Sequence, residues 1–296
     1  MCLSFYFNFI VQIAKPSANN FHRYMDTHKR LPLKRLTIMA CIAILFSCNS
    51  KPRLIDVDPE FSKYIDAYTS GVVSKKNAIR IQLASDASVT HTVNETIKES
   101  LFDLSPSVPG KAYWVDARTI EFKPDKDLST DALYTVSFKL GKVADVSSKF
   151  SNFHFNIQTL KPSFQVNESG LKSNGKETMS FSGQLLTADM EESVAVEKML
   201  SAKYNDNSIK INWQHNEAAR THDFTITGIK RMNAAGKLIV SWDGKAINSN
   251  ITGNDETDVP ALGDFVVLNA KAIQEEEQYA LVQFSDPITP GQILDG

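Results

Sequence analysis

LFDLSPSVPGKAYWVDARTIEFKPDKDLSTDALYTVSFKL, residues 101–140, is the stretch that decides the fold. Within it, apolar and polar residues alternate over three short runs, and turn-forming residues separate these runs. The runs are AYWVD (112–116), RTIEFKP (118–124) and YTVSFKL (134–140). Alternation with a period of two predicts strands that bury one face. We expect the inward positions to form a core, and these are Trp114, Ile120, Phe122, Tyr134 and Phe138.

Similar runs lie on both sides of this stretch. Ile79, Ile81 and Leu83 alternate with polar residues, and NFHFNIQT follows at 152–159. Short strands separated by turn signals every 8–15 residues are typical of an antiparallel sandwich. The pattern breaks at Lys161-Pro162 and then begins again. We therefore predict an all-β chain of tandem antiparallel β-sandwiches, the first over 63–160 and the second over 162–255.

Two segments of the second cycle are less regular. SVAVEKMLSAKY (193–204) fits either a strand or one short helix, and we expect a mixture of the two. NSNITGNDETDVP (248–260) is polar and acidic, which is the composition of a linker.

The end of the chain repeats its beginning. AIRIQLASD (78–86) resembles YALVQFSD (279–286), and pairing Gln82 with Gln283 gives an offset of 201 residues. That offset equals two units of about 100 residues, the size of an immunoglobulin sandwich. Residues 263–296 are then expected to begin a third domain that the sequence truncates.

Charge divides the chain into a basic leader and an acidic body. Of 32 Lys+Arg and 34 Asp+Glu, six basic residues and one acidic residue lie within 1–47, which leaves 26 basic and 33 acidic residues from position 48 onward. This balance is typical of an exported protein, and it gives no reason to expect nucleic-acid binding. A hydrophobic content of 42% excludes wholesale disorder and a polytopic membrane protein.

The leader has the plan of a secretory signal. KRLPLKR (29–35) is followed by LTIMACIAILFS (36–47), which carries no charge, and then by Cys48. The apolar run is shorter than the ~20 residues that cross a bilayer. Its end resembles the lipobox of bacterial lipoproteins, although Phe46 stands where a small residue is usual. We predict a signal peptide over 25–47 and lipidation of Cys48; the alternative is an ordinary signal peptide with a chance cysteine.

Three further expectations follow from the leader. Met25 would be a sufficient start, so residues 1–24 are interpreted as a candidate mis-called start. Residues 48–62, which are polar and contain two prolines, are predicted to form a lipidated tether. Cys48 is the only cysteine of the mature chain, so we expect no intramolecular disulfide, no cysteine-based zinc site and no cysteine nucleophile.

No catalytic constellation is recognisable in the mature chain. His215 and Glu217 form an HxE triplet close to His222, but the PCxxC pair of zinc deaminases is missing. The sequence has no GxSxG, phosphate loop or HExxH. Four further groups have simpler structural explanations: His91 and His154; Asp125, Asp127 and Asp131, without the glycine of an EF-hand; Glu275, Glu276 and Glu277; and Trp114, Trp213 and Trp242. We expect no enzyme activity, no metal and no cofactor.

The stretch 101–140 resembles the N-terminal macroglobulin domain of bacterial alpha-2-macroglobulins. The matching elements are the F-x-L-x-P turn from Phe102, the W-x-D-x-R-T-I-x-F-x-P hairpin from Trp114 and the closing L-x-x-x-x-x-Y-x-V-x-F pair from Leu128. FSDPI (284–288) resembles the opening of a further such domain. In that family a bait segment is cut by a protease, which the molecule then traps, often through a CxEQ thioester; this sequence contains neither a bait region nor CxEQ.

The resemblance implies the membrane-anchored N-terminal scaffold of a broad protease inhibitor. Its expected partner is a membrane, reached through the lipid anchor, and proteases are expected only for the full-length protein. The expected location is the cell envelope, on the outer membrane facing the periplasm. The alternative is an Ig-like adhesion or glycan-binding surface lipoprotein.

Overall fold

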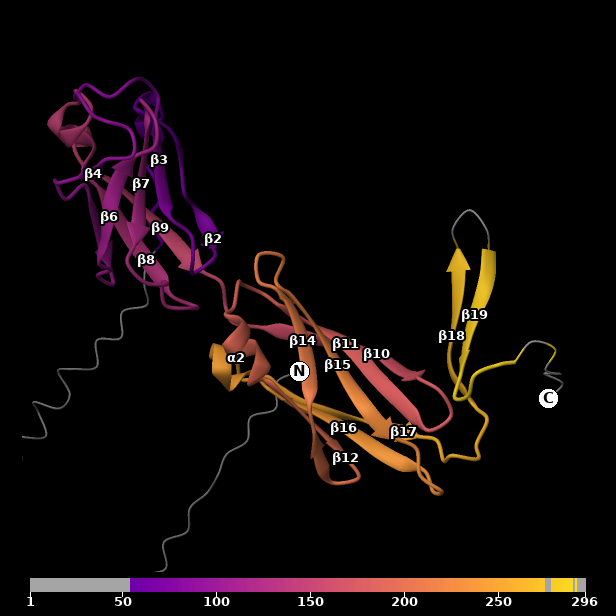
Figure 1. The fold of residues 1–296 in the computed structure, drawn as a ribbon. Coiled ribbons are helices and arrows are strands. Elements are labelled where there is room, and N and C mark those ends of the chain that lie inside the picture. The colour runs from indigo at the N-terminus through magenta and orange to yellow at the C-terminus, as the bar shows by residue number, and fades with distance from the viewer. Residues whose placement is uncertain (1–53, 275–277, 290, 292–296) are drawn as a thin grey trace, which may run out of the picture. The chain divides into compact units, whose positions relative to one another are not determined.

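The computed structural model describes residues 54–274, 278–289 and 291, and these form an all-β protein (Figure 1). Several antiparallel sheets build tandem Ig-like sandwiches, so the predicted fold class is confirmed. The predicted signal peptide, Cys48 and the segment 1–24 lie outside the described residues.

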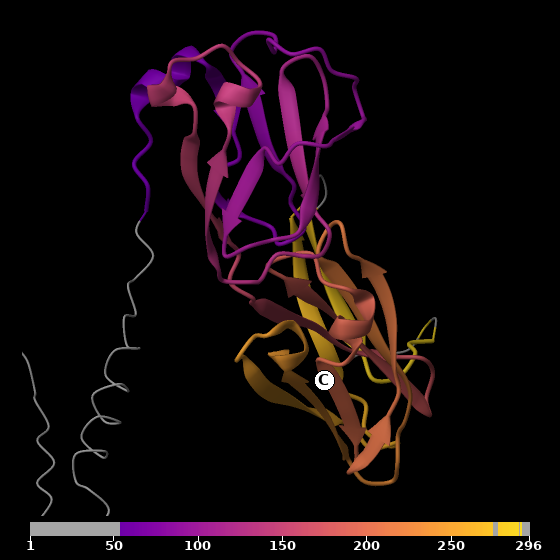
Figure 2. The ribbon, with the colours of Figure 1, turned by 90° about the vertical axis from the view of Figure 1, so that its left-hand side faces the viewer.

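The first sandwich consists of a five-stranded and a four-stranded sheet (Figures 1 and 2). In spatial order, the five-stranded sheet contains β1 (Ile65–Tyr68), β3 (Ile79–Leu83), β7 (Thr119–Pro124), β6 (Gly110–Trp114) and β4 (Thr96–Ile97). The four-stranded sheet contains β2 (Gly71–Val73), β9 (Phe153–Thr159), β8 (Leu133–Phe138) and β5 (Phe102–Ser105). All of these pairings are antiparallel except β2 with β9.

The β6–β7 hairpin is the centre of the deciding stretch. Its register places Trp114 opposite Ile120, and the turn between them is held by Asp116, whose Oδ1 accepts hydrogen bonds from the backbone N–H groups of Arg118 (2.8 Å) and Thr119 (2.7 Å). An aspartate that bonds the backbone two and three residues ahead stabilises a tight turn. The sequence between the two strands therefore specifies the hairpin locally.

The five predicted core residues are all buried in one cluster between the two sheets. Their exposed fractions run from 0% for Ile120 and Phe138 to 5% for Phe122. Tyr134 is buried as well, and its phenol oxygen accepts a hydrogen bond from the N–H of Ser129 at 2.9 Å. The partner satisfies the one polar atom that this side chain brings into the core.

The predicted tether is too long at its C-terminal end. A short 3₁₀ helix, η1 (Pro59–Lys63), forms within it, with Asp58 as its N-cap. Phe61 packs edge-on against Phe153 of β9, with ring centroids 4.9 Å apart. Because apolar side chains of this segment contact the core, the first sandwich begins before residue 63.

The second sandwich consists of two four-stranded antiparallel sheets. One contains, in spatial order, β10 (Phe164–Ser173), β11 (Thr178–Thr187), β15 (Thr221–Lys230) and β14 (Ile211–Asn216). The other contains β13 (Asn207–Ile209), β12 (Leu200–Tyr204), β16 (Gly236–Asp243) and β17 (Thr252–Val259). Their inner faces form a separate core that includes Met179, Phe181, Phe224 and Ile226.

Residues 193–204 form the expected mixture. The helix α2 (Ser193–Glu197) is followed directly by strand β12. Three short 3₁₀ helices occur besides η1 in the described part of the chain: η2 (Leu140–Lys142), η3 (Ser148–Phe150) and η4 (Gly244–Ile247). Among the described residues, no helix is long and apolar enough to cross a membrane.

The predicted linker at 248–260 is wrong. Strand β17 lies within it and pairs with β16 over eight residues, from Gly236 opposite Val259 to Asp243 opposite Thr252. β17 is an edge strand, so most of its side chains face water and can be polar. Val259 is the only residue of β17 that is both apolar and buried. Because β17 belongs to this sheet and ends at Val259, the second sandwich extends past residue 255.

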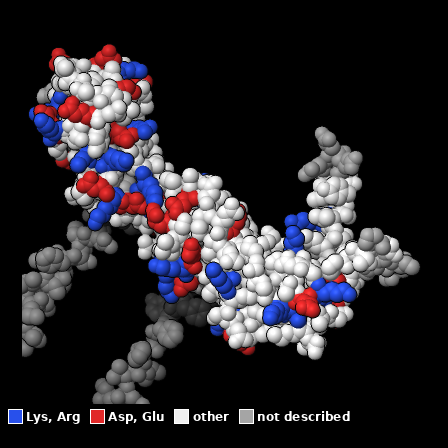
Figure 3. Space-filling model, viewed as in Figure 1, with Lys and Arg blue, Asp and Glu red and all other residues white. Residues whose placement is uncertain are grey.

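A separate two-stranded sheet follows, made of β18 (Val267–Gln274) and β19 (Gln278–Phe284) (Figure 1). Val267, Tyr279 and Leu281 are each about half exposed. In Figure 3 this hairpin is free of acidic side chains over its described part, whereas both signs of charge mix on the first sandwich. The segment predicted to begin a third domain therefore forms a hairpin with apolar residues on its surface.

Candidate functional site

The HxE triplet does not act as a unit. His215 lies on β14 directly opposite His222 on β15, and the two Nδ1 atoms are 2.9 Å apart. Glu217 turns away, and its Oε1 accepts hydrogen bonds from the N–H (2.8 Å) and the hydroxyl (2.6 Å) of Ser193 at the start of α2. Within 54–274, 278–289 and 291, no group of three or more His, Cys, Asp or Glu side chains could hold a metal ion.

The other sequence candidates have structural surroundings. His91 stacks on Trp114 with ring centroids 3.9 Å apart, and His154 is exposed on β9. Trp213 and Trp242 pack against the second core. Asp125, Asp127 and Asp131 are exposed, and Glu275, Glu276 and Glu277 lie outside the described residues. The described side chains among these candidates are not brought together with the histidine pair.

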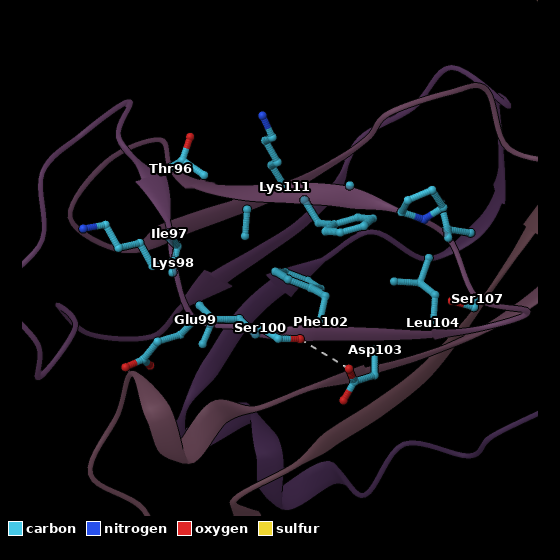
Figure 4. A pocket seen from close by; sticks show the side chains of 16 residues that line it. Thr96, Ile97, Lys98, Glu99, Ser100, Phe102, Asp103, Leu104, Ser107 and Lys111 are labelled. Atoms are coloured by element: carbon cyan, nitrogen blue, oxygen red, sulfur yellow. Dashed lines mark hydrogen bonds between the residues drawn. The ribbon is translucent and has the colours of Figure 1, made fainter.

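A slot opens at the side of the first sandwich, where edge strands β4 and β5 of the two sheets face each other. Its volume is about 540 Å³. In Figure 4, Thr96 and Lys111 lie on one side of it and Phe102 and Leu104 on the other, while the Ser100 hydroxyl bonds Asp103. The slot combines an apolar floor with a charged rim.

One wall of the slot is an open sheet edge. The N–H of Lys139 donates to the carbonyl of Leu101, which sets the alternation of hydrogen-bonded pairs between β5 and β8. In that alternation the backbone groups of Phe102 and Leu104 point away from β8. An edge of this kind can accept a further strand.

Charged side chains join the two sandwiches. Lys75, after strand β2, places its Nζ 2.6 Å from Oε2 of Glu191, and its backbone N–H donates to Oδ2 of Asp189 at 2.8 Å. The side chains of Lys75 and Glu191 are only 13% and 5% exposed. Next to them, the more exposed Lys76 pairs with Glu192. We call this set of contacts, made by Lys75 and Lys76 with residues 189–192, the joint.

Burial shifts the pKa of one carboxyl group in the joint. Desolvation raises the pKa of Glu191, and the hydrogen bond from Lys75 opposes that rise without cancelling it. Lys76 responds in the ordinary way to an ion pair, because its hydrogen bond to Glu192 raises the pKa of its ammonium group. The joint is therefore held by a shielded pair flanked by a more accessible one.

A second fixed point lies between the second sandwich and the β18–β19 hairpin. The side chain of Arg231 is fully buried and donates hydrogen bonds to one carboxylate and several backbone carbonyls. The acceptors are the carbonyls of Lys176 (2.9 Å), Pro260 (3.3 Å), Ala261 (2.6 Å), Asp264 (2.7 Å) and Ser285 (3.2 Å), and Oδ2 of Asp286 (2.9 Å). Only the rigid fork of a guanidinium group offers this many donors in one plane.

Sequence reasoning missed the joint and Arg231. Nothing in the residues around Lys75 or in the DMEE run predicts that they meet, because 116 residues separate Lys75 from Glu191. For Arg231 a signal existed in the sequence of its partners: Ser285 and Asp286 end the segment YALVQFSD (279–286), which resembles AIRIQLASD (78–86). Ser285 is fully buried, and its hydroxyl donates to the Asp264 carbonyl at 2.8 Å.

Residues 55–164 match the family model described as the bacterial Ig-like domain. This range covers the first sandwich and reaches the first residue of β10. The similarity to bacterial Ig-like domains therefore concerns the first sandwich. No curated protein matches the chain.

Several solved structures resemble the chain at low identity. L,D-transpeptidase 3 from Mycobacterium tuberculosis is 13% identical, with 41% of this chain and 45% of that chain covered and a TM-score of 0.22. The I9–I11 tandem of titin is 10% identical, covering 67% and 64%, with a TM-score of 0.26. An L,D-transpeptidase from Mycobacterium smegmatis is 10% identical, covering 78% and 76%, with a TM-score of 0.24.

Proposed function

We propose that this chain is the membrane-anchored N-terminal scaffold of a bacterial alpha-2-macroglobulin-like broad protease inhibitor, whose bait and thioester regions lie outside this sequence. The observation that carries the proposal is the pair of fixed points along the chain. The Lys75–Glu191 contact joins the two sandwiches, and Arg231 fastens the following hairpin to the second sandwich. A scaffold needs fixed angles between its units, and buried, geometrically specific contacts supply them.

The macroglobulin assignment is supported by the hairpin residues that carry the resemblance. Trp114, Ile120 and Phe122 all enter the first core, and Asp116 holds the turn. Bacterial Ig-like domains in general also use such a hairpin, so the inhibitor role depends in addition on the lipobox and the FSDPI restart. We propose that the chain is not an enzyme and that proteases bind only the full-length protein.

The anchor is the second part of the proposal. A charged leader and a short apolar run end at Cys48, and a cysteine with several acyl chains is enough for stable membrane attachment. We place the acidic body in the cell envelope, on the outer membrane facing the periplasm. The proposed partner of the chain is therefore the lipid surface of that membrane, and no nucleic-acid partner is proposed.

Fractionation of cells that express the full gene tests the anchor. The wild type is expected in membranes, with a lipid-modified peptide that begins at Cys48, and Cys48→Ala is expected in the soluble fraction. Cys41→Ala, inside the leader, is the matched control and should leave the protein in membranes. Equal solubility of the wild type and Cys48→Ala would overturn the anchor.

Protease inhibition tests the scaffold assignment. Residues 52–296, which contain both sandwiches and the β18–β19 hairpin, are the fragment to test. They are expected to leave the activity of a panel of proteases on large protein substrates unchanged, while the product of the full gene inhibits them. Inhibition by residues 52–296 alone, or no inhibition by the full product, would contradict the proposal.

The alternative is an Ig-like adhesion or glycan-binding surface lipoprotein, and the slot favours it. An extended partner segment could pair with the open edge of β5 while its side chains contact the apolar floor. Chitohexaose and a hydrophobic hexapeptide are suitable probes in an NMR titration of ¹⁵N-labelled residues 52–296. Saturable shifts at Lys98, Phe102 and Leu104 would support a recognition module, and unchanged spectra would exclude recognition of either probe.

A further inference from the structure

We propose that β19 is an acceptor strand, whose free edge pairs with an extended partner strand of the pattern found in β7. The partner would run antiparallel to β19 and place large apolar side chains on the same face as Ala280 and Val282. In the part of the chain that the structure describes, β19 has one neighbouring strand, β18, and its other edge is unpaired (Figure 1). An open edge presents a row of backbone N–H and C=O groups that can pair with another strand.

The β18–β19 hairpin repeats the β1–β3 pair of the first sandwich. Both pairs are antiparallel, and in both the register slips by one residue at the same place. The pairs on either side of the slip are Ile65–Leu83 and Ala67–Gln82 in the first sandwich, and Val267–Phe284 and Asn269–Gln283 in the hairpin. The offset of 201 residues that relates the two sequence segments therefore also relates the two strands β3 and β19, and it matches their bulges.

The hydrogen bonds of the two pairs have the same phase. In the first sandwich the N–H of Ala84 donates to the carbonyl of Tyr64 at 2.9 Å. At the matching position of the hairpin the N–H of Ser285 donates to the carbonyl of Val266, also at 2.9 Å. The same residues of β3 and β19 therefore point toward the neighbour that precedes them in the chain.

The backbone groups of Ala280, Val282 and Phe284 point away from β18. Along an antiparallel strand, residues that bond one neighbour alternate with residues that face the opposite edge. The counterparts of these three residues in β3 are Ile79, Ile81 and Leu83. In the first sandwich this opposite edge is occupied by β7, and the N–H of Leu83 donates to the carbonyl of Arg118 at 2.8 Å. The N–H of Phe284 is the equivalent donor of β19.

The side chains of β19 agree with its backbone. The three counterparts in β3 lie in the first core and are 0–1% exposed. The matching row of β19 is apolar as well, but its central residue, Val282, is 39% exposed. Leu281 and Gln283, from the other face of the strand, line a small cavity against residues 169–172 of β10. The apolar row of Val282 therefore lies on the face of the hairpin that is turned away from this cavity.

β19 lacks the features that protect edge strands from pairing. Charged side chains, prolines and bulges normally do so. β17, an edge of the second sandwich, carries Asp255, Glu256 and Asp258, and the edge strand β10 carries a bulge after Glu168. By contrast, Gln278–Phe284 contains no charged residue and no proline. The edge of β19 is therefore accessible to a further strand.

β7 defines the chemistry of the partner. It pairs antiparallel with β3 and sets Phe122 and Ile120 opposite two residues of the buried row. In the same register on β19, a residue like Phe122 would lie opposite Ala280 and one like Ile120 opposite Val282. In the proposed full-length inhibitor such a strand would belong to the domain that FSDPI opens. This source rests on the proposed function, whereas the acceptor edge does not.

An NMR titration with a peptide tests the acceptor edge. The protein is ¹⁵N-labelled residues 52–296, and the probe is the synthetic peptide DARTIEFKPD, which is the sequence of residues 116–125. Saturable shifts are expected at the amides of Ala280, Val282 and Phe284. These shifts should exceed those of the residues between them, because only alternate residues bond the added strand.

Variants separate strand pairing from unspecific apolar contact. Val282→Pro removes an outward N–H and should weaken peptide binding about tenfold, while the hairpin persists because this residue bonds nothing in β18. Leu281→Thr removes an exposed apolar side chain from the other face, and this matched control should bind like the wild type. If the Ser285 amide shows that the proline disturbs the hairpin, Val282→Lys serves in its place. A peptide with Ile120→Asp and Phe122→Asp should give no saturable shift.

Sedimentation of residues 52–296 without peptide examines the competing occupant. The fragment is expected to stay monomeric as its concentration rises, because one strand pair buries less area than a stable dimer needs. A dimer that Val282→Pro abolishes would show that β19 pairs with a second copy. That dimer, the absence of peptide shifts in β19, or equal binding of the two peptides would overturn the proposal. Protease inhibition by the full gene product is measured separately, so failure of the acceptor edge and failure of the inhibitor assignment can be told apart.

Discussion

Lys75 and Glu191 form an ion pair of 2.6 Å between the two sandwiches, and both side chains are largely shielded from water. The same lysine donates its backbone N–H to Asp189, so one residue of the first sandwich holds the acidic loop at two points. An ion pair that is shielded from water is stable only over a narrow range of distances and orientations of its two charged groups. It therefore specifies an angle between the domains more than it adds stability.

Replacing Glu191 by Gln should weaken the joint. The ammonium group of Lys75 would lose its countercharge in a shielded place, a loss of roughly 1–3 kcal/mol in coupling between the sandwiches. Thermal unfolding should then separate into two transitions. The control is Glu192→Gln, whose side chain is 67% exposed and which should change the coupling by less than about 1 kcal/mol. If Glu191→Gln and Glu192→Gln change the coupling between the sandwiches equally, burial of the ion pair does not determine its contribution.

Replacing Arg231 by Met should release the hairpin. The substitution removes the positively charged partner of Asp286 and the guanidinium hydrogen bonds to several buried carbonyls, and breaking a buried pair in this way costs about 3–5 kcal/mol. Amide hydrogen exchange in β18 and β19 is expected to become faster while the first sandwich is unaffected. Arg220→Met is the matched control, since that side chain is exposed. Unchanged amide hydrogen exchange of β18 and β19 in Arg231→Met would contradict the claim that Arg231 fixes the hairpin to the second sandwich.

Trp114→Ala should destabilise the first sandwich by about 3–5 kcal/mol, because the indole is 4% exposed and packs between the sheets. This is a large part of the roughly 5–15 kcal/mol that holds an ordinary domain together. Urea titration followed by the ¹⁵N–¹H amide signals of β6 and β7 and by circular dichroism measures the loss, because the two remaining tryptophans lie in the second sandwich. Lys123→Ala on the same hairpin is exposed and should stay close to the wild type.

The second sandwich should lose stability as the pH rises from 4.5 to about 7. Burial, together with the carboxyl group of Asp255 beside it, raises the pKa of Glu168 from 4.5 to about 7. The folded state binds that proton more tightly than the unfolded state, so its contribution is complete below pH 4.5 and is lost through pH 7.

Glu168→Gln isolates this effect from other titrating groups. The difference in melting temperature between Glu168→Gln and the wild type should grow in favour of the variant as the pH rises through that window. Glu177→Gln, on the loop before β11, should show no such trend. A constant difference between Glu168→Gln and the wild type would contradict the raised pKa.

Local patterns were enough to predict the sandwiches and the first core. Ile120 and Phe122 alternate with polar residues in the sequence and are buried in the structure, and the short helix within 193–204 was expected. The β17 strand was missed because an exposed edge strand carries polar residues on both faces, and this composition is indistinguishable from that of a linker.

Contacts between distant segments could not be predicted. Lys75 and Glu191 have no common motif, and only the folded chain brings them together. The two histidines of the His215–His222 pair are close in the sequence, but their contact could not be predicted, because strand register decides that the rings meet. Sequence patterns reveal the alternation of apolar and polar residues, whereas contacts between distant residues depend on the tertiary fold.

The central claim is that the two sandwiches form one rigid scaffold, and a distance distribution between them at pH 7.5 tests it most directly. Residues 52–296 contain no cysteine, so spin labels can be attached at Asp145→Cys in the first sandwich and Lys203→Cys in the second, both exposed positions. Double electron–electron resonance should give a single narrow distance distribution, which broadens when Lys75→Met is added and stays narrow with the exposed control Lys203→Cys/Asp145→Cys/Lys63→Met. A broad distribution in the chain with Lys75 intact, or one that Lys75→Met leaves unchanged, would contradict the account.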